Sequence, residues 1–147
     1  MKFVVLSILI ISDFISKKII VSYLDVNQFV TIMPYLKITH IHNYGISFGL
    51  FSNFLSSWII ILVGLIISTF LFFWLIKSNS LIEKWGILLI LSGALGNIFD
   101  RIINNYVVDF IYMHYKSHYW PAYNLADIYI TIGILLILMT TFKILKE

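Results

Sequence analysis

Two aspartates in the second half of the chain lie in apolar sequence, where an unpaired carboxylate is costly. Asp109 stands between Val-Val and Phe-Ile-Tyr, and Asp127 comes close to the start of a long apolar run. Two carboxylates held close together cannot both ionise, so one keeps its proton at neutral pH. Such a pair can activate a water with one acid and protonate a carbonyl oxygen or a leaving amine with the other. The pattern therefore predicts acid–base chemistry by two acids that a loop joins.

Two acids of this region, Asp127 and Asp100, also have a simpler explanation to be weighed. Asn124 precedes Asp127 by three residues, so the two could cap a helix whose dipole favours a negative charge in its first turn. Asp100 is followed by Arg101, and an ion pair or a bond to another helix would make it structural. Asp109 has no such neighbour, which favours a functional role for it.

Other polar residues gather in three stretches. Asp13 and Lys17 are four apart with the acid first, the favourable order for a helical pair. They are either a structural ion pair or charges that hold another group in place. Asn43 and Gly45 suggest a turn whose backbone approaches a partner closely, or an ordinary loop. Asn97 shares one helix face with the acid three residues later.

Other chemistries are less well supported. The chain has no cysteine, which excludes disulfides and thiolate chemistry. His114 and His118 have helical ligand spacing, and His40 and His42 would share a strand face, but no H-E-x-x-H pattern accompanies them. No serine stands in a G-x-S-x-G turn. We therefore expect no metal and no cofactor, and the scattered basic residues argue against nucleic acid.

The composition indicates an integral membrane protein. Of 147 residues 61% are hydrophobic and 12% charged, and the mean hydropathy is +0.97. A soluble domain of this size cannot hide so much apolar surface. We expect a single domain over 1–147, in which four runs are long enough to cross a bilayer. They are about 3–22, 57–76, 84–103 and 124–143.

The first run resembles a signal peptide, but Asp13 interrupts it and no A-x-A site follows. Basic residues divide evenly between the two sides of the membrane, so their count does not orient the chain. The compact basic loop 77–84 and the basic ends favour termini in the cytoplasm. Segments 23–56 and 104–123 would then lie outside.

Each outer segment has its own pattern. Residues 29–42 are β-branched and partly alternating, which predicts a short hairpin. Residues 48–58 are aromatic and weakly polar, as in a segment lying in the membrane interface. Tyrosines and Trp120 in 104–123 predict an aromatic belt at headgroup depth.

Four motifs together resemble a known family. They are DFISK at 13–17, NYGISFG at 43–49, GALGNIFDR at 93–101 with VVDF at 107–110, and YNLAD at 123–127 with Ile130 and Gly133. In order and spacing they resemble the bacterial lipoprotein signal peptidases, the type II signal peptidases, over essentially the whole chain.

The resemblance implies an all-α integral membrane protein with four transmembrane helices, a small extracytoplasmic β-subdomain and an interfacial helix. It implies an aspartic endopeptidase in the bacterial cytoplasmic membrane, with Asp109 and Asp127 as the catalytic dyad near the outer face. The substrate would be a prolipoprotein, cut just before a cysteine that carries diacylglycerol. Membrane lipid would be the other partner of a monomer, and we expect segment 48–58 to act as a lid.

Eight further residues would support the dyad or position the substrate. They are Asp13, Lys17, Asn43, Gly45, Asn97, Asp100, Arg101 and Asn124.

Some positions depart from the family pattern. Ser92 and Asn105 stand where glycine is usual, Ile46-Ser47 replace a smaller pair, and Tyr123 replaces phenylalanine. Asparagine tolerates positive φ, so the turn at Asn105 can survive. None of these changes removes a proposed catalytic group.

Two other classes of protein remain open. A small transporter or proton-relay subunit would also explain acids in the membrane, but it predicts acids throughout the depth and an inverted repeat. A non-catalytic lipoprotein-binding or assembly factor is the other. Cleavage of a precursor by the purified protein, without metal or ATP, would separate all three.

Overall fold

A computed structural model describes residues 2–46 and 56–141. It contains the helices α1 (Lys2–Tyr23), α2 (Ser57–Lys77), α3 (Leu81–Asn104) and α4 (Leu125–Thr141). Its strands are β1 (Phe29–Met33), β2 (Leu36–Asn43), β3 (Val107–Tyr115) and β4 (His118–Tyr119). Each predicted span thus coincides closely with a helix. The expected small β-subdomain is also present, since the described strands form a four-stranded sheet.

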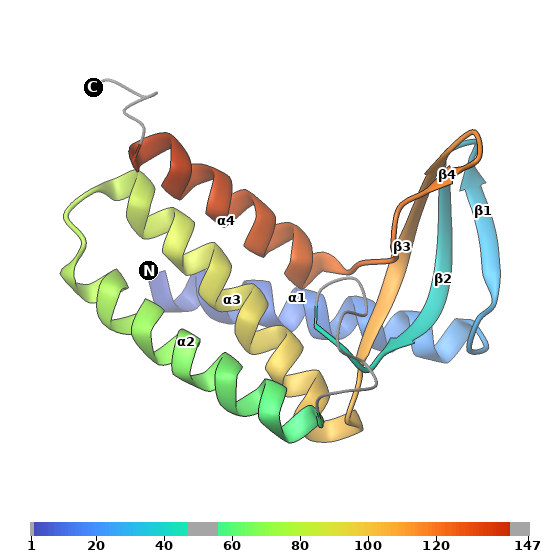
Figure 1. Cartoon of the computed structure of the whole chain (residues 1–147), viewed down its shortest axis with the longest axis horizontal. Helices are drawn as coiled ribbons and strands as arrows, with labels where there is room; N and C mark the ends of the chain where they lie inside the picture. The colour runs from blue at the N-terminus through green and yellow to red at the C-terminus, as the bar shows by residue number, and fades with distance from the viewer. Residues whose placement is uncertain (1, 47–55, 142–147) are drawn as a thin grey trace.

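The helices lie side by side, and the sheet stands at one end of them (Figure 1). The start of α1, the α2–α3 turn and the end of α4 are at the opposite end. By length and composition α2 and α3 could each cross a membrane, while the apolar α4 is shorter. In α1 the buried residues are the charged Asp13 and Lys17, and apolar side chains face outward.

Helix α3 is the central element, since it contacts each of the other three helices. Its residues Ile87, Leu88 and Leu91 pack against Leu71 and Leu75 of α2 in the apolar core. The helix begins after Ser80, whose hydroxyl caps it, and ends at a left-handed C-cap. That C-cap is Asn105 at φ 65°, so the turn survives without the usual glycine.

Helices α3 and α4 touch through glycines. A Cβ atom on Gly93 would lie 2.3 Å from the carbonyl oxygen of Ala126, and one on Gly133 would lie 2.5 Å from that of Gly86. Small residues allow such close backbone approach in membrane helices. Ser92 is buried, and its hydroxyl bonds within α3 to the Leu88 carbonyl. This crossing fixes the start of α4 against α3.

The sheet is antiparallel in the order β1-β2-β3-β4. The predicted hairpin in 29–42 is confirmed as β1–β2, whereas the strand β3 occupies part of the segment 104–123 that was predicted as a loop. In the β2–β3 register Ile41 lies opposite Asp109. The backbone N–H groups of Phe110 and Ile111 both donate to the Tyr123 carbonyl, at 3.0 and 2.8 Å. These bonds place the start of α4 beside the middle of β3.

The predicted interfacial segment and lid, 48–58, lies mostly outside the described residues. Its last residues, Ser57 and Trp58, belong to α2.

Candidate active site

Asp109 and Asp127 reach the same place from different elements. Asp109 comes from β3 and is 3% exposed, while Asp127 is in the first turn of α4. Asn124 contacts both: its side-chain amide donates to Asp109 Oδ1 at 2.6 Å, and its backbone N–H donates to Asp127 Oδ2 at 3.2 Å. One buried residue therefore joins the two carboxyl groups.

The helix cap considered from the sequence is also present. The N–H of Asp127 donates to Asn124 Oδ1 at 3.1 Å, so Asn124 and Asp127 form a reciprocal capping pair. The cap does not compete with the pairing of the acids. Because the Asn124 oxygen is taken by a backbone N–H, its NH₂ group must face Asp109.

Two further asparagines also donate hydrogen bonds to the acids. Asn43 donates to Asp109 Oδ2 at 2.9 Å, and the N–H of Gly45 donates to the Asn43 oxygen at 2.9 Å. Asn97 donates to Asp127 Oδ1 at 2.9 Å. Each of the four carboxyl oxygens thus accepts one N–H from the protein.

Lys17 of α1 bonds to three polar side chains near the two acids. Its ammonium group lies 2.7 Å from Asp13 and 3.0 Å from Asp100, and it donates to the Asn97 oxygen at 2.9 Å. These bonds use all three donors of the lysine. They also orient Asn97, because lysine can only donate and therefore the asparagine NH₂ must face Asp127. The pair predicted within α1 is confirmed, and Asp100 bonds across to another helix.

Asp13 has a further contact that the sequence did not suggest. Its Oδ1 accepts the backbone N–H of Ala126 at 2.9 Å, in the first turn of α4. The ion pair of α1 therefore also holds the helix that carries Asp127. Nothing in the local sequence of α1 points to a contact 113 residues away.

Arg101 lies behind the asparagines. It donates to the carbonyl oxygens of Asn97, at 3.1 Å, and of Gly45. Its Nε atom is buried and has no hydrogen-bond partner among the described residues. The bond to Gly45 holds the turn that carries Asn43. The positive charge of Arg101 also interacts with both Asp109 and Asp127.

The electrostatic setting of Asp109 departs from that of an ordinary carboxyl. Burial raises its pKa from 3.8 to about 7, and the charge of Asp127 acts in the same direction. The amides of Asn43 and Asn124 lower the pKa but do not offset burial. Asp109 therefore keeps its proton to a higher pH than an ordinary carboxyl group does.

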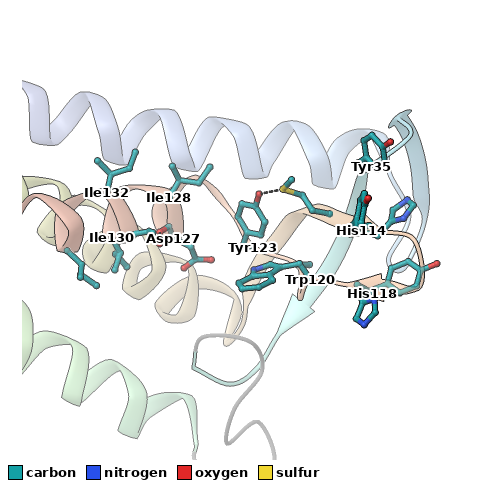
Figure 2. Close-up of a pocket in the computed structure, with 15 residues that line it drawn as sticks. Tyr35, His114, His118, Trp120, Tyr123, Asp127, Ile128, Ile130 and Ile132 are labelled. Carbon is teal, nitrogen blue, oxygen red and sulfur yellow. Dashed lines mark hydrogen bonds between the residues drawn. The ribbon is translucent and has the colours of Figure 1, made fainter. Parts of the chain in front are cut away.

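A cavity of about 920 Å³ opens beside Asp127, between α4 and the β3–β4 hairpin (Figure 2). Isoleucines of α4 form one wall, and aromatic side chains of the hairpin form the far end. Residues that line it include Asp127, Ile128, Ile132, Tyr123, Trp120 and Tyr119. We call this cavity the α4 groove. Its apolar walls suit a lipid or an apolar peptide.

One of the two histidine arrangements considered from the sequence is confirmed and the other is not. His114 and His118 lie on the two strands of a hairpin and not on a helix. His40 and His42 do share a strand, but their Nε2 atoms bond to each other at 3.0 Å. Within 2–46 and 56–141 no group of three potential metal ligands from His, Cys, Asp and Glu comes together.

The fold and the site together define a small helical membrane protein with two linked carboxyl groups beside an apolar groove. The model of the family described as signal peptidase (SPase) II matches residues 5–143. The chain belongs to the signal peptidase II family and is a peptidase.

Relatives and solved structures agree with this membership. A lipoprotein signal peptidase of Acinetobacter baylyi is 42% identical over 147 residues, covering 97% of this chain and 82% of the relative. One from Thermodesulfovibrio yellowstonii is 38% identical over 137 residues, covering 92% and 90%. A bacterial membrane enzyme solved at 2.3 Å by the in meso method is 30% identical, with a TM-score of 0.88 over 97% of this chain and 87% of that one.

Proposed function

We propose that the chain is an aspartic endopeptidase that removes signal peptides from prolipoproteins. It cuts just before a cysteine that carries diacylglycerol. The observation that supports this most is Asn124, which joins the carboxyl groups of Asp109 and Asp127 at the edge of the α4 groove. Membership in the signal peptidase II family and the name lipoprotein signal peptidase of its relatives support the substrate class.

The two acids take different roles because their environments differ. Asp127 takes the part of the base, since it lies in the first turn of α4 where the helix dipole and the Asn97 amide favour a negative charge. Asp109 carries the proton, since burial raises its pKa to about 7. Two carboxyls whose environments separate their proton affinities provide an acid and a base.

In the first step Asp127 removes a proton from a water, whose oxygen bonds to the scissile carbonyl carbon. Asp109 gives its proton to the carbonyl oxygen, which yields a neutral tetrahedral intermediate. In the second step Asp127 returns its proton to the amine as the C–N bond breaks. The hydroxyl proton goes back to Asp109 and the carboxylic acid forms.

The supporting residues hold this geometry. Asn43, Asn97 and Asn124 orient the carboxyl groups, and Lys17 with Asp13 and Asp100 orients Asn97. They have no direct part in proton transfer. Gly45 and Arg101 fix the turn that carries Asn43.

All four helices cross the cytoplasmic membrane of a bacterium, and the single domain acts as a monomer without metal, cofactor or nucleic acid. Both termini face the cytoplasm and the dyad lies near the outer face. The position of the sheet opposite the start of α1 and the end of α4 supports this arrangement (Figure 1).

The test is cleavage of a diacylglyceryl-modified precursor by purified protein in detergent. Asp109→Asn and Asp127→Asn should each lower turnover by about 10²–10⁴-fold, the usual contribution of a general acid or base. Asp25→Asn, at an exposed position after α1, is the matched control and should cleave normally. Near-normal turnover in either variant, when it is correctly inserted in the membrane, would contradict the assignment of Asp109 and Asp127 as the catalytic pair.

A further inference from the structure

A polar side chain in the wall of the α4 groove has no part in the proposed proton transfers. The Tyr123 hydroxyl donates to the sulfur of Met113 at 2.9 Å. A thioether is a weak acceptor, so this donor can change partner at little cost. Figure 2 shows Tyr123 between Asp127 and the aromatic end of the groove.

The backbone of Tyr123 is fixed although its hydroxyl is weakly held. Its N–H donates to Ile111 at 3.1 Å, and its carbonyl accepts from Phe110 and Ile111. The next residue is Asn124, which joins the two acids. The position of the tyrosine ring relative to the dyad is therefore set by the same backbone contacts that set the dyad.

Another hydroxyl in the same wall is already used. Thr131 donates to the Asp127 carbonyl of its own helix at 2.8 Å. Burial raises the pKa of Tyr123, so its hydroxyl keeps the proton that a donor needs.

The substrate class brings an acceptor to this place. A diacylglyceryl cysteine has a thioether next to the scissile bond, then a glycerol with two ester carbonyls, then acyl chains. With the scissile bond at Asp127, the acyl chains can follow the isoleucine wall of the groove. The ester carbonyls then enter an apolar space, where an acceptor without a donor is costly.

We propose that Tyr123 is a positioning residue, whose hydroxyl leaves Met113 and donates to an ester carbonyl of the substrate's diacylglyceryl group. This rests on the proposed function, because it takes the lipidated precursor as the substrate. The hydroxyl thereby sets how deeply the lipid lies in the groove, and so where the bond before the cysteine lies relative to the acids.

The experiment compares two precursors that differ only in the lipid linkage, a diacyl ester and a dialkyl ether. Purified wild type should show a KM for the ether precursor about 2–10-fold higher than for the ester, the effect of one neutral hydrogen bond, with kcat little changed. Tyr123→Phe should raise the KM for the ester to the ether value and lose the discrimination.

Tyr129→Phe is the matched control, since its hydroxyl bonds to Ser12 on α1 at 2.9 Å, and it should keep the ester preference. An equal ester-to-ether ratio in wild type and Tyr123→Phe would overturn the inference. So would a fall in kcat on both precursors alike, which a merely structural role predicts. If wild type cleaves neither precursor the proposed function itself is wrong, whereas equal KM values for both in wild type contradict this inference alone.

Discussion

At the scale of residues, the site is oriented by groups that can only donate. Lys17 and two backbone N–H groups take the side-chain oxygens of Asn97, Asn43 and Asn124. All three NH₂ groups must then face the carboxyl oxygens. The amide orientation of each asparagine is therefore fixed, with its donor group toward the acids.

The raised pKa of Asp109 predicts how activity depends on pH. Because Asp109 gives its proton to the scissile carbonyl, kcat should fall above a pH of about 7. The decline should approach tenfold per pH unit as the protonated fraction falls. A pH–rate profile on the lipidated precursor measures this, and a kcat that stays level to pH 9 would contradict it.

The same pKa predicts a change in stability. Between pH 3.8 and about 7 the folded protein holds a proton on Asp109 that the unfolded chain has lost. Folding stability from this group is thus greatest at low pH and falls as pH rises, by up to about 1.4 kcal/mol per unit. Asp109→Asn should remove this dependence. Thermal unfolding in detergent from pH 5 to 8 should show a Tm difference, variant minus wild type, that grows with pH.

A Tm difference that is independent of pH would mean that Asp109 titrates alike in the folded and unfolded states. The trend is the informative quantity. The absolute difference also contains the loss of one amide contact, since an asparagine offers only one acceptor oxygen to Asn43 and Asn124.

At the scale of elements, a buried charge cluster joins three helices. Lys17 of α1 binds Asp100 of α3, and Asp13 of α1 caps the first turn of α4. Removing one partner from a buried ion cluster leaves an uncompensated charge and typically costs about 3–5 kcal/mol. The cluster therefore couples the stability of the bundle to the geometry of the site.

Lys17→Met should accordingly lower the free energy of unfolding by about 3–5 kcal/mol and reduce turnover, because Asn97 loses the group that orients it. Lys18→Met is the control, at the adjacent exposed position. Unfolding in detergent and the cleavage assay are the measurements. Equal stability of the two variants would show that the charge cluster adds nothing to the stability of the bundle.

The α3–α4 crossing makes a second prediction at this scale. Gly93→Ala would set a Cβ 2.3 Å from the Ala126 carbonyl, so α4 must shift together with Asp127. Overpacking should cost about 1–3 kcal/mol and lower turnover. Gly64→Ala should be tolerated, because its Cβ would meet only the side-chain end of Ile98, at 2.9 Å. Similar turnover in both variants would show that the α3–α4 crossing does not control the geometry of the site.

The helices were predictable and part of the sheet was not. Long apolar runs have few alternatives in a chain of this composition, and the β-branched alternation in 29–42 marks a hairpin locally. Strand β3 pairs with β2 across more than sixty residues, as in Ile41 with Asp109, and no local pattern reports such a pairing. Its aromatic residues predicted a membrane belt and did not mark a strand.

The site was predictable in its members but not in its connections. Polar residues in an apolar chain are few, so Asp13, Lys17 and Asn97 were conspicuous. Their contacts with Ala126 and Asp127 depend on how α1, α3 and α4 cross. The α4 groove was missed because isoleucines that line it look the same in sequence as isoleucines that face lipid.

At the scale of the whole molecule, apolar side chains cover the outside of the bundle. On α2, Ile66, Phe70 and Phe73 are about 60% exposed, at 62%, 63% and 58%. Such a surface fits contact with lipid. In the proposed arrangement the sheet lies at one membrane face and the α2–α3 turn at the other (Figure 1).

Because the chain has no cysteine, single cysteines can report this topology. Ser117→Cys, in the β3–β4 turn, should react with a membrane-impermeant maleimide in intact cells. Asn79→Cys, in the α2–α3 turn, should react only after permeabilisation. Both positions are exposed. The reverse pattern would invert the orientation and place the dyad at the cytoplasmic face.

The central claim is that Asp109 and Asp127 act as one unit that cuts before the lipidated cysteine. The most direct measurement is turnover of the lipidated precursor by Asp109→Asn, Asp127→Asn and the double variant, with product masses that identify the cleaved bond. Residues that act as a unit are strongly non-additive. The double variant should therefore retain about the same residual activity as either single variant. Losses that multiply in the double variant, or products cut elsewhere, would contradict the account.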